Sequence, residues 1–189
     1  MNVDHANHAP DLVGTAVRAL MLYSLAEFQG GNATTIRVTA QGHSFGIADD
    51  GRGHSLDRSV EGIPYLKFIY SHFDHPFGSG RSAPVQLQGI GMSLINALCS
   101  ELTLTVRKRD ERLEQAFREG RLESSDRIAV ASQETGITLS GKINPQLRCG
   151  EADVARLEGW LLEVLTSSPS LRLFLNGREL KVSDRPELL

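Results

Sequence analysis

The sequence predicts an α+β fold, a two-layer sandwich in which helices pack on one face of a mixed, mostly antiparallel sheet. Segments in which apolar and polar residues alternate, typical of half-buried strands, recur from residue 34 onward, and turn residues join several of them. Apolar or amphipathic helical segments lie before, between and after these strands. We expect residues 1–10 to form a flexible N-terminus and residues 11–189 to form a single domain.

The composition is that of an ordinary globular protein. Of 189 residues, 40% are hydrophobic and 23% are charged, so the chain is long enough for a substantial core. A formal net charge of −3 argues against direct nucleic-acid binding. No apolar run reaches the roughly 18 residues of a membrane span, and the first ten residues lack the pattern of an export signal. With two cysteines that have neither metal-ligand spacing nor a disulfide framework, a cytoplasmic protein with reduced thiols is expected.

The domain is predicted to begin with a helix that is apolar around most of its circumference. Asp11 is the expected N-cap, and the helix runs to about Phe28, before Gly30-Gly31. We expect it to be buried inside the domain, with cover by a protein partner or a second copy as the alternative. The remaining expected elements are strands 34–40 and 44–49 in a hairpin, helix 56–73 interrupted near 62–64, helix 92–101, strands 102–107, 108–120, 127–131 and 136–143, helix 151–166, and a closing hairpin of strands 171–175 and 179–182.

Two glycine-rich runs carry the functional signal. The first, residues 47–53, ends a strand with two carboxylates and continues into a tight turn. The second, residues 87–93, opens onto an apolar helix, whose N-terminus would expose unpaired N–H groups to an anion. A hydrogen-bond acceptor in one run and a phosphate cradle in the other together indicate a nucleotide site. Residues 74–88, rich in glycine, proline and serine just before the cradle, are predicted to form a lid.

The order of these motifs resembles the Bergerat-fold (GHKL) ATPases, and within them the N-terminal ATPase domain of DNA gyrase B and topoisomerase IV. The resemblance rests on the first helix, on Asp-Asp-Gly-Arg-Gly at 49–53, on Gly-Ile-Gly at 89–91 and on Thr135-Gly136, and it covers roughly residues 11–182. It implies a gyrase-B-like, histidine-kinase-like ATPase fold that binds ATP or ADP.

The resemblance also implies a role for each matching residue. Asp49 would accept a hydrogen bond from the adenine amino group, which distinguishes adenine from guanine, and Thr135 would join the same water-linked network. Gly53 would let the base approach the backbone, and Arg52 would stack on it. The other implied contacts are backbone N–H groups to the phosphates from Gly89, Ile90 and Gly91, and a place beside the pocket for Arg107.

The first helix departs from the family's pattern. Gyrase-type relatives carry a glutamate there as general base, followed one turn later by an asparagine that holds Mg²⁺. Aligning Glu27 and Gly30-Gly31 with the family's helix end places Ala19 at the glutamate position and Tyr23 at the asparagine position. The chain is thus expected to have no catalytic base and no metal ligand at these positions, and hydrolysis is expected to be weak or absent.

Three interpretations remain open. The first is adenine-nucleotide binding with weak or absent hydrolysis. The second is a pseudoenzyme or protein-interaction module that no longer binds nucleotide, because Tyr23 is bulky where metal and phosphates would lie. The third is an ATPase that uses Asp50 or Glu61 as its base, although strand alternation turns Asp50 away from the pocket that Asp49 faces.

The chain is shorter than the gyrase-type proteins it resembles. It would lack the transducer-like domain that supplies a lysine to the γ-phosphate, and the N-terminal arm that is exchanged between gyrase protomers. From Met1 and the charged, unpatterned C-terminal residues we expect a complete small protein.

Overall fold

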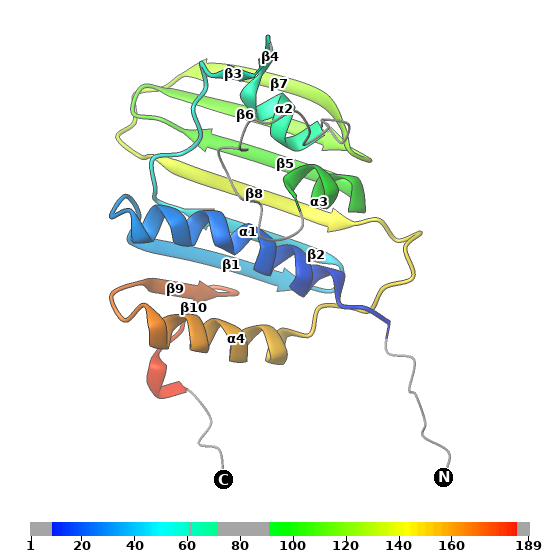
Figure 1. Cartoon of the computed structure of the whole chain (residues 1–189), viewed down its shortest axis with the longest axis vertical. Coiled ribbons are helices and arrows are strands. Elements are labelled where there is room, and N and C mark those ends of the chain that lie inside the picture. The colour runs from blue at the N-terminus through cyan, green and yellow to red at the C-terminus, as the bar shows by residue number, and fades with distance from the viewer. Residues whose placement is uncertain (1–8, 61, 72–90, 185–189) are drawn as a thin grey trace, which may run out of the picture.

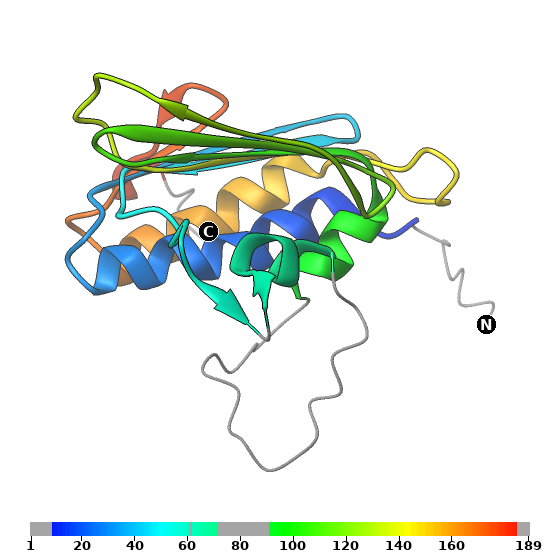
Figure 2. The ribbon, with the colours of Figure 1, turned by 90° about the horizontal axis from the view of Figure 1, so that it is seen from above.

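The computed structural model describes residues 9–60, 62–71 and 91–184. The predicted lid at 74–88 and most of the predicted N-terminal segment lie outside these residues. In the described part, four α-helices lie on one face of an eight-stranded sheet, and no described helix covers the opposite face (Figures 1 and 2). The predicted α+β sandwich is confirmed.

The elements follow one another as helix, hairpin, helices, strands, helix and final hairpin. Their bounds are α1 (Leu12–Gln29), β1 (Thr35–Gln41), β2 (Ser44–Asp49), β3 (Ser59–Val60), β4 (Ile63–Pro64), α2 (Tyr65–Ser71), α3 (Met92–Leu98), β5 (Cys99–Arg107), β6 (Glu111–Arg118), β7 (Arg121–Ala129), β8 (Gly136–Ile143), α4 (Val154–Ser167), β9 (Arg172–Leu175), β10 (Arg178–Glu179) and the 3₁₀ helix η1 (Val182–Asp184). The large sheet has the order β10-β9-β1-β2-β8-β5-β6-β7, in which β1 and β9 run parallel and the other neighbours antiparallel.

The first helix packs over β1 and β2 (Figure 1). Asp11 caps it by accepting a hydrogen bond of 2.7 Å from the Gly14 N–H group, as predicted. Its core-facing apolar side chains are Val13, Ala16, Val17, Leu20 and Met21, each at most 2% exposed. Leu22 is 47% exposed. Burial within the protein therefore accounts for most of the apolar circumference of the helix.

The core lies between the sheet and its helices. Alternate residues of each central strand point into it, so that Ile36 and Val38 of β1 and Leu139 of β8 are at most 1% exposed. A fully buried side chain of this kind contributes roughly 1.5–3 kcal/mol to the hydrophobic driving force. The same alternation gives the sheet its helix-covered and helix-free faces.

Several predicted boundaries were wrong. The helix expected over 56–73 is confined to Tyr65–Ser71 within the described residues, because Gly62, at φ +80°, forms the turn of the small β3–β4 hairpin. The helix expected to reach residue 101 ends at Leu98, since the following residues pair with β8. Strand β7 begins at Arg121 rather than 127. It is an exposed edge strand, so its first half shows no apolar alternation. The last strand, β10, has only two residues.

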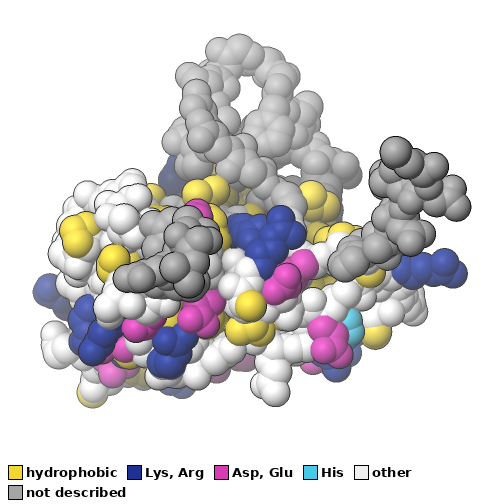
Figure 3. Space-filling model, turned by 90° about the horizontal axis from the view of Figure 1, so that it is seen from below, with side chains coloured by type: hydrophobic (Ala, Val, Ile, Leu, Met, Phe, Trp, Pro, Cys, Tyr) yellow, Lys and Arg dark blue, Asp and Glu magenta, His cyan; other side chains and the backbone are white. Residues whose placement is uncertain are grey.

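Charges of both signs are dispersed over the face formed by α4 and β10. Figure 3 shows Lys and Arg side chains beside Asp and Glu side chains there, not one patch of a single sign. Arg178, for example, pairs with Glu158 at 2.6 Å and with Asp184 at 3.2 Å. Among the described helices, none is both long and apolar enough to cross a membrane. The cytoplasmic location stays a prediction.

Candidate functional site

Asp49 ends β2 under the first helix and is only 5% exposed. The Ser24 hydroxyl of α1 donates to its Oδ2 atom at 2.6 Å, and the Gly51 N–H group donates to its Oδ1 atom at 3.0 Å. A carboxylate oxygen has two lone pairs, so each oxygen of Asp49 can accept a further hydrogen bond. The structure therefore holds a fixed, buried acceptor at the end of β2.

The neighbouring Asp50 side chain is exposed and engaged elsewhere. It accepts hydrogen bonds from the backbone N–H groups of Thr34 and Thr35, at 2.7 and 2.9 Å, and from the Thr34 hydroxyl at 2.6 Å. Partial burial raises the pKa of Asp50, but these hydrogen bonds outweigh it and hold the pKa below its usual value. Asp50 thus ties β2 to the start of β1, and Glu61, the other candidate base, lies outside the described residues.

The turn that follows Asp49 is held from two sides. The Arg52 guanidinium donates to the Glu27 carboxylate from Nε at 3.1 Å and from Nη2 at 2.8 Å. Lys108 donates to the carbonyl oxygens of Arg52 at 2.7 Å and of Gly53 at 3.2 Å. The hydrogen bond from Arg52 lowers the pKa of Glu27 more than partial burial raises it. Arg52 was predicted to stack on a base. In the structure it forms an ion pair with Glu27 of α1.

Two glycines make close packing around Asp49 possible. Gly53 has φ +68°, and a Cβ atom there would lie 3.0 Å from both the Gly136 carbonyl oxygen and a methyl group of Val106. Gly136 has φ +120°, and a Cβ atom there would overlap the carbonyl oxygen of Asp49. The structure thus gives Gly53 a packing role against β5 and β8, and its predicted approach to a base stays a prediction.

The other predicted site residues are placed around this end of the sheet. Thr135 is half-buried and directly precedes Gly136, and among the described residues it makes no direct hydrogen bond to Asp49. Arg107 donates to the Thr138 hydroxyl at 2.8 Å and to the Ile137 carbonyl oxygen at 3.2 Å, so it is bound to β8. Gly91 is the N-cap of α3, whereas Gly89 and Ile90 lie outside the described residues.

The structure also assembles an aromatic cluster beside Asp49 that the sequence did not predict. We define it as Tyr23 of α1, His54 after the turn, and Tyr65 and Tyr70 of α2. The His54 ring makes edge contacts with Tyr65 and Tyr70, with ring centroids 6.3 and 6.2 Å apart. Burial raises the pKa of Tyr70 well above its usual range, and electrostatic interactions with Tyr23, Tyr65 and Asp49 add to this shift. All three tyrosines of the chain are in the cluster.

Within the part of the chain that the structure describes, several polar atoms in and next to the aromatic cluster are buried and have no hydrogen-bond partner. They are His54 Nε2, Tyr70 Oη and Asn96 Oδ1, although the Asn96 amide donates to the Tyr70 carbonyl at 2.7 Å. A buried polar atom without a partner costs about 1–3 kcal/mol, so such atoms mark places where water or a ligand binds. Burial and the positive charge of Lys108 lower the pKa of His54 to about 4, so its ring is neutral at pH 7.

The two side chains predicted to stand at the family's base and Mg²⁺ positions do not suit a metal. Ala19 is 9% exposed and offers a methyl group. Tyr23 offers a phenol whose pKa is raised by burial and by Tyr65, so it stays protonated. Mg²⁺ prefers carboxylate, carbonyl and water oxygens. Within residues 9–60, 62–71 and 91–184, no group of three or more His, Cys, Asp or Glu side chains could hold a metal.

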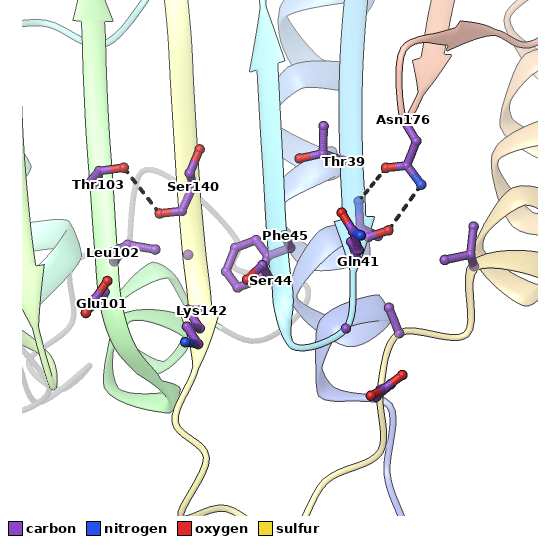
Figure 4. Close-up of a pocket in the computed structure, with 16 residues that line it drawn as sticks. Thr39, Gln41, Ser44, Phe45, Glu101, Leu102, Thr103, Ser140, Lys142 and Asn176 are labelled. Atoms are coloured by element: carbon purple, nitrogen blue, oxygen red, sulfur yellow. Dashed lines mark hydrogen bonds between the residues drawn. The ribbon is translucent and has the colours of Figure 1, made fainter.

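A pocket of about 980 Å³ lies at the other end of β2 from Asp49. Figure 4 shows Thr103 of β5 and Ser140 of β8 on neighbouring strands in its lining, with Lys142 near Glu101. Asn176, which also lines it, is bonded to the Ala40 backbone in both directions, at 2.9 and 3.1 Å. None of the buried, unpartnered polar atoms of the described residues lines this pocket. The Asp49 end of the sheet is therefore the candidate site.

No protein-family model matches the chain. Among curated proteins, the DNA gyrase B protein of Campylobacter jejuni is 30% identical over 122 residues, which is 61% of this chain and 16% of the relative. The DNA gyrase B protein of Streptococcus pyogenes serotype M3 is 29% identical over 129 residues, which is 66% of this chain and 20% of the relative. The chain thus spans a fifth or less of the length of these relatives.

Solved structures give a likeness that covers more of the chain. The ATP-binding domain of Francisella tularensis topoisomerase IV aligns with a TM-score of 0.72 and 20% identity, over 87% of this chain and 83% of that one. The 43K ATPase domain of Thermus thermophilus gyrase B aligns with a TM-score of 0.71 and 24% identity, over 87% of this chain and 44% of that one. The chain therefore has the fold of the ATP-binding domains of topoisomerase IV and DNA gyrase B, and in sequence it resembles DNA gyrase B.

Proposed function

We propose that this chain binds adenine nucleotides, ATP or ADP, at the Asp49 end of β2. The buried Asp49 carboxylate carries the proposal. Ser24 and Gly51 fix its orientation and leave it acceptor capacity for the amino group of adenine. Guanine presents a carbonyl oxygen at that place, which a carboxylate repels, so the site favours adenine. The likeness to solved ATP-binding domains supports the same ligand class.

The bound nucleotide is hydrolysed weakly or not at all. A general base must lie within hydrogen-bond reach of the attacking water, and the methyl group of Ala19 cannot accept a proton. Asp50 is held by Thr34 and Thr35 and is unavailable as a substitute. The phenol of Tyr23 is a poor ligand for the Mg²⁺ that assists phosphoryl transfer.

Titration calorimetry with ATP, ADP and GTP, with and without Mg²⁺, tests this function. We expect ATP and ADP to bind and GTP to bind more weakly. Asp49→Asn should weaken adenine binding, because an amide presents a donor where the amino group needs an acceptor. Glu101→Gln also replaces a carboxylate by an amide, but at the end of β5 away from the candidate site, so it should leave binding unchanged. A folded protein that binds no adenine nucleotide even at millimolar concentrations would exclude the proposal.

A pseudoenzyme or protein-interaction module is the second candidate, and the aromatic cluster favours it. Tyr23 stands at the predicted Mg²⁺ position, and its bulky ring would take space that the metal and phosphates need. The same titrations separate the two functions. Binding of ATP or ADP that Asp49→Asn abolishes excludes the second candidate, and the lack of binding to any adenine compound supports it.

A further inference from the structure

The cations around the candidate site are already engaged within the protein. Arg52 pairs with Glu27, and Arg107 donates to β8 through Thr138 and Ile137. Lys108 donates to two carbonyl oxygens of the turn, and burial lowers its pKa, followed by the charge of Arg52. Apart from the backbone N–H groups predicted at residues 89–91, a triphosphate, which carries several negative charges, is bound by cations or by Mg²⁺. To neutralise it, these side chains would have to give up hydrogen bonds that they already make.

The two positions predicted to hold the base and Mg²⁺ do not supply the missing positive charge. The Ala19 methyl group and the neutral Tyr23 phenol stand where a carboxylate and an amide oxygen would bind water and Mg²⁺. A metal-bridged triphosphate is therefore not favoured by the described residues.

The buried polar groups of the site suit an uncharged ligand. Tyr70 is fully buried, and its hydroxyl has no hydrogen-bond partner among residues 9–60, 62–71 and 91–184. The His54 ring packs against it, and His54 Nε2 is likewise unpartnered. Both groups are neutral at pH 7, so they complement ring nitrogens and hydroxyl groups better than phosphate oxygens. His54 directly follows the turn at residues 49–53, so its contact with Tyr70 places the Tyr70 ring next to that turn.

We propose that the site is a purine-nucleoside site, in which adenine and ribose supply the affinity and the phosphates and Mg²⁺ add little. This inference rests on the proposed function, because it takes adenine to be bound at Asp49. It goes further in naming the part of the nucleotide that this chain binds. Adenosine and AMP should then bind with affinities similar to those of ADP and ATP.

Calorimetric titration with adenosine, AMP, ADP and ATP, each in Mg²⁺ and in EDTA, tests the inference on the full chain. We expect the dissociation constants of adenosine and ATP to agree within roughly threefold and not to respond to Mg²⁺. ATP with Mg²⁺ binding about tenfold or more tightly than adenosine would overturn the inference and leave adenine binding intact. If no adenine compound binds, the proposed function itself falls.

Tyr70→Phe gives a second, independent readout. The Tyr70 hydroxyl makes no hydrogen bond to the described residues, so its removal should leave the midpoint of urea unfolding unchanged or raise it. If the ligand or its bridging water uses this hydroxyl, adenosine affinity should fall by roughly three- to tenfold in the same variant. ATP affinity should fall by the same factor. An adenosine affinity equal to that of wild type, in a variant that unfolds cooperatively, would contradict the inference.

Discussion

The Ser24 hydroxyl lies 2.6 Å from Asp49 Oδ2, and this hydrogen bond joins the middle of α1 to the end of β2. Both side chains are at most 5% exposed, so neither group has water as an alternative partner. The bond therefore stabilises the fold and also sets the orientation of the carboxylate in the candidate site.

Ser24→Ala should lower the free energy of unfolding by about 1.5–3 kcal/mol, because it removes a hydrogen bond to a buried charge. Urea unfolding at pH 7 measures this. Ser44→Ala, at an exposed position in the β1–β2 hairpin, is the control and should change stability by about 0.5 kcal/mol or less. Equal effects of the two substitutions would show that the Ser24 hydrogen bond contributes nothing specific.

Gly136→Ala should be severely destabilising, by about 3 kcal/mol or more, because its φ of +120° is strained for alanine and its Cβ atom would overlap the Asp49 carbonyl oxygen. Gly159→Ala is the opposite case. Gly159 lies within α4 with open space around it, so alanine should stabilise the helix by about 0.5–1 kcal/mol. Thermal melts of the two variants should shift in opposite directions, and a tolerated Gly136→Ala would contradict the close packing of Gly136 on Asp49.

His54 should make stability depend on pH. Its pKa is about 4 in the folded protein and near 6.5 when unfolded, so the unfolded chain binds the proton first. The contribution of the neutral ring is full above pH 6.5 and is lost as the pH falls toward 4. Between these values His54 should add a slope approaching about 1.4 kcal/mol per pH unit. Urea unfolding across this range should show a shallower slope for His54→Leu, and parallel curves would refute the assignment.

Glu27→Gln should destabilise the protein at pH 7 and much less in acid. Arg52 holds the folded pKa of Glu27 below its usual 4.5, so the ion pair contributes above that value and is lost as the pH falls through the folded pKa. The pair is partly exposed, so we expect a loss of about 1 kcal/mol or less at pH 7. Wild type and variant should converge in stability as the pH falls through the folded pKa. A constant difference at all pH values would show that packing, not charge, is responsible.

Ala19→Glu combined with Tyr23→Asn should give Mg²⁺-dependent ATP binding, if only these two positions silence the catalytic end. The i, i+4 spacing directs both side chains to one site. We expect Mg²⁺ to tighten ATP binding by about tenfold or more, and phosphate release to appear. Ala19→Gln with Tyr23→Asn is the matched control, which keeps the metal ligand but lacks the base. If the folded Ala19→Glu, Tyr23→Asn variant binds ATP no more tightly with Mg²⁺ than without it, then other changes in the site also prevent metal-dependent binding.

Local patterns were sufficient to predict the first helix and the hairpin. The Asp11 cap, the alternation of 34–40 and 44–49, and the position of Asp49 at the strand end are all encoded over a few residues. The stretch between residues 56 and 64 was mispredicted because Gly62 and Pro64 favour a small hairpin over a helical turn. The predicted strand at 127–131 missed the first half of β7, because an edge strand needs no apolar alternation.

The sequence by itself determined the fold class and the acidic strand end, because hydrophobic periodicity and glycine turns act between near neighbours. Only the tertiary structure decided what surrounds Asp49. Ser24 reaches it from 25 residues away, and His54, which follows the turn after Asp49, meets Tyr70 of α2 although the two come from separate segments. Such contacts depend on how α1 and α2 pack on the sheet. That packing is a property of the whole core rather than of any one stretch of sequence.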